Sequence, residues 1–226
     1  MDIWYQSLKA LLLTYRGFFQ RSVYIRGLDN LIPGPKIIIG NHSNVTDPFV
    51  LPFLVKEKLH CFVQEEFFSI RVLGPLFKRA DQIPVAHGRG REAINIAIDR
   101  LKKGNSVLIF PEGVLNHGRD FHRARTGAVI LAAESGMPIV PIGFYVPERF
   151  MRTFHSDHYN RRTVGRWQFG GPSYLQIGEA ERIPENLIRE SNYKALRLAA
   201  ERIMGSVADL VNLARRDAGE PPLLKT

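Results

Sequence analysis

The chain has 226 residues, a length that allows one large domain or two small ones. Its single cysteine excludes an intrachain disulfide, and its longest uncharged stretch is broken by glycines and prolines, which argues against a membrane-spanning helix. The formal net charge of +9 indicates an anionic partner: nucleic acid, an acidic membrane or an acidic substrate.

Residues 1–21 predict an amphipathic helix, because seven apolar residues recur at helical spacing: Trp4, Leu8, Leu11, Leu12, Tyr15, Phe18 and Phe19. Lys9 interrupts the apolar stretch and no small-residue cleavage site follows, so we expect the segment to stay in the mature protein. The helix either packs on its own domain or lies in a membrane interface. Aromatic and leucine side chains opposite basic ones suit the interface, and anionic lipid attracts basic residues.

Short apolar runs then alternate with helical patterns over residues 22–216. Strands are expected at 36–40, 59–63, 83–85, 106–110, 138–146 and 173–178. Helices are expected at 48–55, 89–103, 127–135 and 193–215. This alternation predicts an α/β fold: one domain with a mostly parallel sheet flanked by helices, whose sites form beyond the carboxyl ends of strands. We expect 147–172 to be a long loop or small insertion and 217–226 to be a flexible tail.

The first expected strand stops at Gly40, and the polar cluster NHSNVTD follows at once. Asp47 before Pro48 is typical of a helix start, and His42 would then hydrogen-bond within a turn. The same residues also suit catalysis, because an imidazole accepts a proton from a hydroxyl and a carboxylate on its other nitrogen fixes the tautomer. No serine lies in a nucleophile-elbow pattern, so the pair would activate a substrate hydroxyl. No zinc-ligand spacing is present, and we expect no metal.

Two further motifs accompany this cluster. The sequence FPEG, at 110–113, leaves Glu112 and Gly113 in a turn at the end of an expected strand. The sequence RARTGA, at 123–128, precedes an expected helix, and a helix N-terminus favours anions, so Arg125 is a candidate phosphate contact. Taken alone, FPEG is equally well explained as a plain turn without a function. RARTGA alone is equally well explained as a solvated basic turn.

The order of these blocks is more specific than any one of them. An NHxxxxD block, FPEG about 65 to 70 residues later, and then an apolar strand of the V/I-P type resembles the glycerolipid acyltransferase family, best known for 1-acyl-glycerol-3-phosphate (lysophosphatidate) acyltransferases. The resemblance covers about residues 22–145. It implies that His42 is the general base and that Asp47 orients it. It also implies that Asn41, Glu112 and Gly113 belong to the acceptor site.

Three positions depart from the family pattern. Gln64 stands where a lysine is common, His87 where the second block usually ends in arginine, and Leu115 where the third block usually continues as EGTR. The resemblance associates these positions with the acceptor's phosphate. We expect Arg119, Arg123 and Arg125 to compensate, and we expect Arg89, just after His87, to bind substrate as well. Otherwise the acceptor is a different lyso-lipid, or another lipid with a free hydroxyl.

The resemblance implies a membrane-associated O-acyltransferase that uses acyl-CoA or acyl-carrier protein as co-substrate, without a metal or tightly bound cofactor. Its product from lysophosphatidate is phosphatidate. We expect a peripheral or monotopic location on the cytoplasmic face of an anionic membrane. The alternative from another class is a non-catalytic basic membrane-binding module. Nucleic acid is not an expected partner, because no nucleic-acid motif accompanies the charge, and the oligomeric state stays open.

Overall fold

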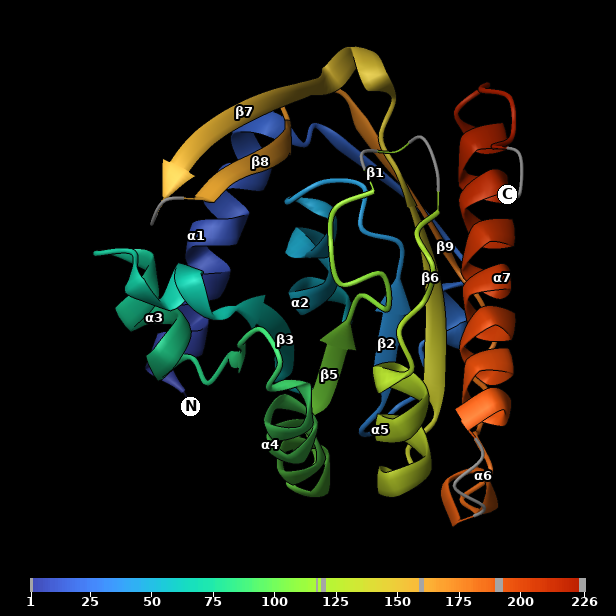
Figure 1. Cartoon of the computed structure of the whole chain (residues 1–226). Helices are drawn as coiled ribbons and strands as arrows, with labels where there is room; N and C mark the ends of the chain where they lie inside the picture. The colour runs from blue at the N-terminus through green and yellow to red at the C-terminus, as the bar shows by residue number, and fades with distance from the viewer. Residues whose placement is uncertain (1, 117, 119–120, 159–160, 190–192, 224–226) are drawn as a thin grey trace.

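The computed structural model describes residues 2–116, 118, 121–158, 161–189 and 193–223 (Figure 1). Seven strands form one sheet in the order β1-β9-β6-β2-β5-β3-β4. They are β1 (Ser22–Arg26), β2 (Ile37–Gly40), β3 (Leu59–Gln64), β4 (Ile83–Val85), β5 (Ser106–Ile109), β6 (Ile139–Tyr145) and β9 (Pro172–Ile177). The α-helices are α1 (Ile3–Phe19), α2 (Leu51–Leu54), α3 (Leu73–Arg79), α4 (Gly90–Lys102), α5 (Gly127–Ser135), α6 (Asn186–Arg189) and α7 (Tyr193–Asp217).

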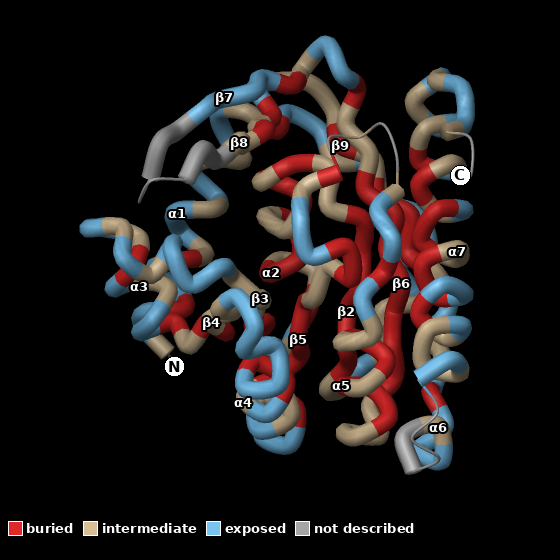
Figure 2. The backbone as a smooth tube through the Cα atoms, viewed as in Figure 1, coloured by how far each residue is buried: buried red, intermediate tan, exposed pale blue. Residues whose placement is uncertain are grey.

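The central strand β2 is apolar throughout because both faces of the sheet are covered. Ile37 and Ile39 join one core with residues of α4, α5 and α7, whereas Ile38 joins a second core that contains Val50 and Leu51. Figure 1 shows α4, α5 and α7 along one face of the sheet, and in Figure 2 β2, β5 and β6 are buried through most of their length. Side chains of successive strand residues point to opposite faces, so three consecutive isoleucines serve both cores.

The sheet is mostly parallel, and the predicted α/β class with helices on a parallel sheet is confirmed. β2 pairs in parallel with β5 and with β6, β3 with β4 and β5, and β1 with β9. The antiparallel pair joins β6 to β9. Parallel strands place their carboxyl ends at one edge, so the loops after β2 and β5, which carry NHSNVTD and FPEG, emerge side by side.

The expected helix at 48–55 is broken into two short pieces. A 3₁₀ helix spans Asp47–Val50 and α2 follows, with a proline in the first turn of each. The sequence suggested Asp47 as the N-cap of this helix, but the residue at the N-cap is Thr46, which makes no side-chain cap bond. The carboxylate of Asp47 binds amides of the preceding turn instead.

Residues 147–172 were expected to be a long loop or a small insertion, and the loop alternative is wrong. This segment contains an antiparallel hairpin of β7 (Met151–His158) and β8 (Arg161–Gln168), which arches from the end of β6 toward α1 (Figure 1). Its arginines and histidines interrupt the apolar alternation from which strands are normally predicted. The short elements β1, α3 and α6 were also missed by the sequence analysis. Apart from α2, described above, the other strands and helices lie within one or two residues of their expected bounds.

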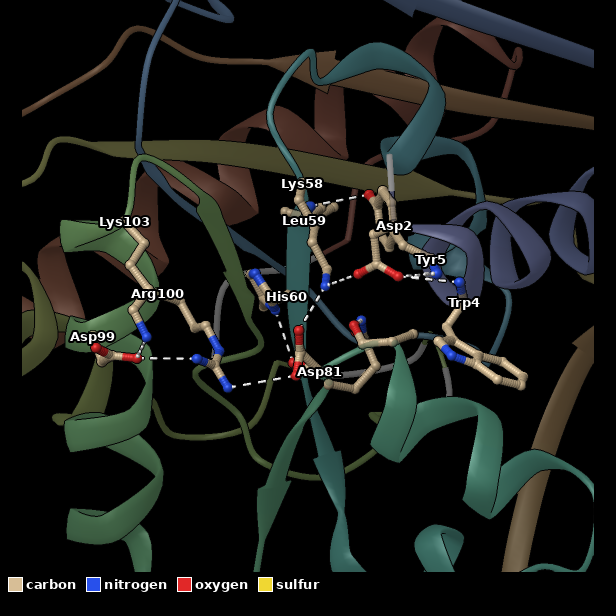
Figure 3. A network of polar contacts seen from close by, with 12 residues as sticks. Asp2, Trp4, Tyr5, Lys58, Leu59, His60, Asp81, Asp99, Arg100 and Lys103 are labelled. Atoms are coloured by element: carbon tan, nitrogen blue, oxygen red, sulfur yellow. Dashed lines mark hydrogen bonds and ion pairs between the residues drawn. The ribbon is translucent and has the colours of Figure 1, made fainter.

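Helix α1 is attached to the domain at its first turn by a polar network (Figure 3). The Asp2 carboxylate accepts hydrogen bonds from the Trp4 and Tyr5 amides and forms an ion pair with Lys58. The Tyr5 hydroxyl accepts a hydrogen bond from the Leu59 amide, at the start of β3. The first turn of the helix is therefore part of the packed domain.

The other end of α1 is attached to the hairpin. The Tyr15 hydroxyl donates a 2.5 Å hydrogen bond to the Gln168 carbonyl, and the Gly170 amide donates to the Phe19 carbonyl. Between these attachments an apolar stripe faces outward: Trp4, Leu11 and Phe18, seven residues apart, are 43%, 45% and 73% exposed. The predicted apolar face is thus divided between the domain and the surface. In the described part of the chain, no helix is long and apolar enough to cross a membrane.

Candidate active site

His42 lies directly beyond the carboxyl end of β2. Its ring stacks on Phe110, with centroids 4.0 Å apart and an interplanar angle of 8°. The His42 amide donates a 3.0 Å hydrogen bond to Oε1 of Glu112, and its carbonyl accepts one from the Asn116 amide. The side chain is 24% exposed, while Nδ1 is buried and has no hydrogen-bond partner among the described residues. The accessible part of the ring therefore lies away from Nδ1.

Asp47 organises the turn that carries His42. Its Oδ2 accepts 2.8 Å hydrogen bonds from the Ser43 and Asn44 amides, and its Oδ1 accepts one from Nδ2 of Asn44. Oδ2 also lies 3.9 Å from Nδ1 of His42, which is too long for a hydrogen bond but close enough to stabilise an imidazolium. The structure therefore brings the two predicted catalytic side chains together.

Glu112 joins the segments around His42. Its Oε1 accepts hydrogen bonds from the His42 amide and from Nδ2 of Asn116, and its Oε2 accepts one from the His122 amide. Only 2% of the residue is exposed, and this burial raises the pKa of the carboxyl group. Glu112 thus holds the His42 turn against the loop after β5.

Gly113 and Arg125 are in contact at one end of that loop. Gly113 has a φ of +70°, and a methyl group there would lie 2.9 Å from Nε of Arg125. The Arg125 amide donates a 2.8 Å hydrogen bond to the Pro111 carbonyl, which fixes the arginine beside the FPEG turn. An exposed guanidinium thus lies over the turn that contains Glu112.

Arg166, on β8, reaches the middle of the same loop, at Gly118, and was not identified from the sequence. A methyl group at Gly118 would lie 3.1 Å from Nη1 of Arg166 and 4.0 Å from Cβ of Ser43. The only sequence signal was the abundance of arginine in 147–172, which does not single out one residue.

Three other predicted substrate-binding residues are not positioned for that role. The Asn41 side chain is buried and exchanges two hydrogen bonds with the Phe144 backbone, so it joins β2 to β6. Arg89 pairs with Glu92 beyond β4, three strands or about 14 Å from β2. Arg123 is exposed and faces Glu201 of α7 at 3.7 Å. Arg119 lies outside the described residues.

The three positions that depart from the expected pattern lie at the same edge of the sheet as His42. Gln64 ends β3, His87 follows β4, and Leu115 lies in the loop after β5. Gln64 and His87 are exposed and Leu115 is half-buried. In the part of the chain that the structure describes, no group of three His, Cys, Asp or Glu residues could hold a metal ion.

The arrangement can perform base catalysis on a hydroxyl. The imidazole has one partly accessible edge and a carboxylate near Nδ1, and two arginines contact the neighbouring loop, at Gly113 and at Gly118. A carboxylate behind the imidazole stabilises the charge that the ring gains when it accepts a proton, and guanidinium groups bind phosphate.

The overall fold resembles a solved structure. The crystal structure of the 1-acyl-sn-glycerophosphate (LPA) acyltransferase PlsC from Thermotoga maritima matches with a TM-score of 0.66, covering 91% of this chain and 79% of that chain. The two sequences are 19% identical, so this likeness concerns the fold.

Two curated bacterial relatives match somewhat more than half of the chain. A 1-acyl-sn-glycerol-3-phosphate acyltransferase of Borreliella burgdorferi is 29% identical over 151 residues, which are 60% of this chain and 58% of that protein. A protein of the same description from Haemophilus influenzae is 26% identical over 138 residues, 59% of this chain and 53% of that protein. The chain thus spans little more than half the length of these relatives.

The family model described as Acyltransferase matches residues 22–145. This range runs from β1 to the end of β6, so it contains His42, Asp47 and the FPEG turn, and it covers more than half of the chain. On this match, the chain belongs to the Acyltransferase family.

Proposed function

We propose that the chain is an O-acyltransferase that transfers a fatty acyl group from acyl-CoA or acyl-carrier protein to the hydroxyl of a lysophospholipid. The leading acceptor is 1-acyl-glycerol-3-phosphate, and the product is then phosphatidate. The observation that carries the proposal is the His42 ring, which is stacked on Phe110 with its Nδ1 edge toward Asp47. Membership of the Acyltransferase family supports the reaction class, and the names of the relatives support the acceptor.

In this proposal His42 takes the proton of the acceptor hydroxyl as the oxygen attacks the thioester carbonyl carbon. The tetrahedral intermediate then collapses, the carbon–sulfur bond breaks, and the imidazolium returns the proton to the thiolate. Asp47 stabilises the imidazolium between these steps. Arg125, whose guanidinium lies beside Gly113, would attract the acceptor's phosphate. The reaction needs no metal or resident cofactor.

We further propose that the protein works at the surface of an anionic membrane, as a peripheral or monotopic protein on the cytoplasmic face. The stripe of Trp4, Leu11 and Phe18 would enter the headgroup region. Beside its end a hollow of about 520 Å³ opens, lined by Phe18, Phe19, Arg21, Phe150, Phe169, Gly170 and Gly171. An apolar stripe beside basic groups suits anionic lipid, and the net charge of +9 adds long-range attraction.

The experiment compares wild type with His42→Ala, using labelled acyl-CoA and acceptors with different headgroups on anionic vesicles. We expect wild type to acylate lysophosphatidate, and His42→Ala to lose nearly all turnover while it still binds the vesicles. Equal turnover in the variant would remove His42 from the mechanism, and no turnover in either protein would favour a binding module. If the protein acylated an unphosphorylated lipid in preference to lysophosphatidate, the assignment of the acceptor would be wrong. This outcome is included because Gln64, His87 and Leu115 depart from the family's phosphate-site pattern.

A further inference from the structure

The His42 ring lacks the hydrogen bond by which a carboxylate commonly orients a catalytic imidazole. Its Nδ1 is buried without a hydrogen-bond partner among the described residues, and Oδ2 of Asp47 lies 3.9 Å away. That oxygen already accepts 2.8 Å hydrogen bonds from the Ser43 and Asn44 amides, which hold it within the turn. At this distance the carboxylate supplies negative charge, but it does not fix the plane of the ring.

Phe110 makes the contact that does fix this plane. The phenyl and imidazole rings lie face to face, with centroids 4.0 Å apart and an interplanar angle of 8°. A small rotation of the imidazole about its Cβ–Cγ bond would drive one edge of the ring into the phenyl face, because the two rings are already in van der Waals contact. Only the flipped ring, which exchanges Nδ1 with Cδ2, would stack equally well. The charge of Asp47 distinguishes these two orientations, since it favours an N–H over a C–H.

The phenyl ring is itself held in place by the core. Phe110 is half-buried and packs against the second core, and its ring meets that of Phe144 with centroids 6.4 Å apart. Phe144 lies against Gly40, where an added methyl group would be 2.6 Å from its ring, and it exchanges two backbone hydrogen bonds with the Asn41 side chain. Gly40 and Asn41 are the two residues before His42. The two phenyl rings and the catalytic turn therefore form one packed unit.

We propose that Phe110 is the positioning residue of His42: its ring fixes the plane of the imidazole, and the charge of Asp47 selects the orientation that points Nδ1 inward. Nε2 then lies on the accessible side, where it takes the proton of the acceptor hydroxyl. After this transfer the imidazolium still lies over the phenyl face, which attracts a cation. This inference rests on the proposed function, since it gives Phe110 a part in the step that His42 performs.

The kinetic test compares wild type with Phe110→Leu, Phe110→Met and Phe110→Tyr, using lysophosphatidate and labelled acyl-CoA. Leucine and methionine are apolar but lack a flat face, so we expect kcat to fall about tenfold to 100-fold while KM stays within a few-fold of wild type. Tyrosine keeps the ring, so kcat should stay within a few-fold. A raised KM with unchanged kcat would overturn the inference, because Phe110 would then act on substrate binding. Equal losses of kcat in the tyrosine and leucine variants would also overturn it.

Nuclear magnetic resonance tests the ring contact without turnover. A stacked phenyl ring shields the ring protons of His42, so in wild type their signals should lie upfield of those of an exposed histidine such as His87. The signals that are missing from the spectrum of His42→Gln identify them among the seven histidines. We expect Phe110→Leu and Phe110→Met to move these signals downfield and Phe110→Tyr to leave them nearly in place. Unmoved signals in both aliphatic variants would overturn the inference.

Phe77→Leu is the matched control. Phe77 is also half-buried, and its ring meets that of Phe68 with centroids 6.0 Å apart. It lies on α3, between β3 and β4 in the chain, and β5 separates these strands from β2. The control should leave kcat and the His42 signals unchanged, and a loss of kcat equal to that of Phe110→Leu would contradict a specific role of Phe110. The melting temperature shows that each variant is folded. Because the spectra need no turnover, wild-type kinetics test the proposed function separately.

Discussion

Nδ1 of His42 and Oδ2 of Asp47 lie 3.9 Å apart, and that same oxygen accepts 2.8 Å hydrogen bonds from the Ser43 and Asn44 amides. The carboxylate therefore builds the turn and places a negative charge behind the imidazole. Asp47→Asn keeps the shape but removes the charge, so we expect kcat to fall on the order of 100-fold or more. Acyl transfer kinetics on labelled acyl-CoA provide the measurement.

Ser43→Ala is the control for this prediction. It removes the hydroxyl that contacts Asp47 but keeps the Ser43 amide bond, so kcat should stay within a few-fold of wild type. If Asp47→Asn retained full kcat, the negative charge behind His42 would have no part in proton transfer.

Glu112 makes stability depend on pH. Burial raises the pKa of its carboxyl group above the ordinary value near 4.5, so the stability that this group contributes is full below pH 4.5 and is lost as pH rises through the raised pKa. A glutamine at position 112 cannot ionise, so Glu112→Gln has no such loss of stability over that pH range. We expect the free energy of unfolding to favour wild type over Glu112→Gln more strongly at pH 4 than at pH 7. Denaturant titration at the two values measures this difference, and a difference that widened toward pH 7 would contradict it.

His60 has the opposite pH dependence. It lies in the network of Figure 3, with Nδ1 2.8 Å from the Asp81 carbonyl and Nε2 buried without a hydrogen-bond partner among the described residues. Burial lowers its pKa below 6.5, so its contribution to stability is full above pH 6.5 and is lost as pH falls through the lowered pKa. We expect His60→Asn to lose less stability than wild type between pH 7 and pH 5.

The melting temperature at the two pH values checks this prediction. His87 is exposed, so His87→Asn serves as the control, and its melting temperature should change with pH as that of wild type does. If His60→Asn and wild type lost equal stability on acidification, another group would be responsible.

Because the apolar stripe of α1 faces outward, a substitution that introduces one negative charge into it tests membrane binding. Leu11 is 45% exposed, whereas Leu12 is half-buried, so Leu11→Glu alters the surface with little effect on the core. Burying a leucine contributes about 1.5–3 kcal/mol, so we expect Leu11→Glu to weaken partitioning onto anionic vesicles roughly tenfold or more. The exposed Gln6→Glu adds the same charge away from the stripe and should have a smaller effect. Equal sedimentation of both variants with vesicles would mean that the stripe does not meet lipid.

Gly143 allows α7 to approach β6 closely. A methyl group at this position would lie 2.4 Å from the backbone of Leu210 and Val211. We expect Gly143→Ala to reduce the free energy of unfolding by about 1–3 kcal/mol, because the helix must move away from the sheet. At Gly205, also in α7, the added methyl meets nothing within 4 Å, so Gly205→Ala should stabilise by about 0.5–1 kcal/mol. Chemical denaturation compares the two, and equal stabilities would contradict the close approach.

Much of the fold could be predicted because local sequence dominates where both faces of the sheet are buried. The isoleucines of β2, the Pro-bracketed β6 and the periodic α7 are apolar at every inward position. The hairpin could not be predicted, since its partners lie far away in the chain: Arg166 contacts the His42 turn, and Tyr15 contacts Gln168. Such contacts leave no periodic signal in the sequence.

The same distinction between local and long-range contacts explains which site residues could be predicted from the sequence. His42 and Asp47 are close in sequence, so their proximity follows from one turn. Whether an arginine faces the site depends on tertiary packing: Arg125 lies over Gly113, whereas Arg89 pairs with Glu92 on an exposed helix start. Sequence identifies arginine-rich segments but does not show which guanidinium reaches the loop.

The pairing of β1 with β9 has a consequence for synthesis. Ser22 pairs with Pro172, so β1 must wait for most of the chain to leave the ribosome before its partner exists. Until then α1 also lacks its contact with Gln168, and its aromatic and leucine side chains have no folded hairpin to cover them. The N-terminal helix therefore cannot complete its packing until the C-terminal part of the chain has been made.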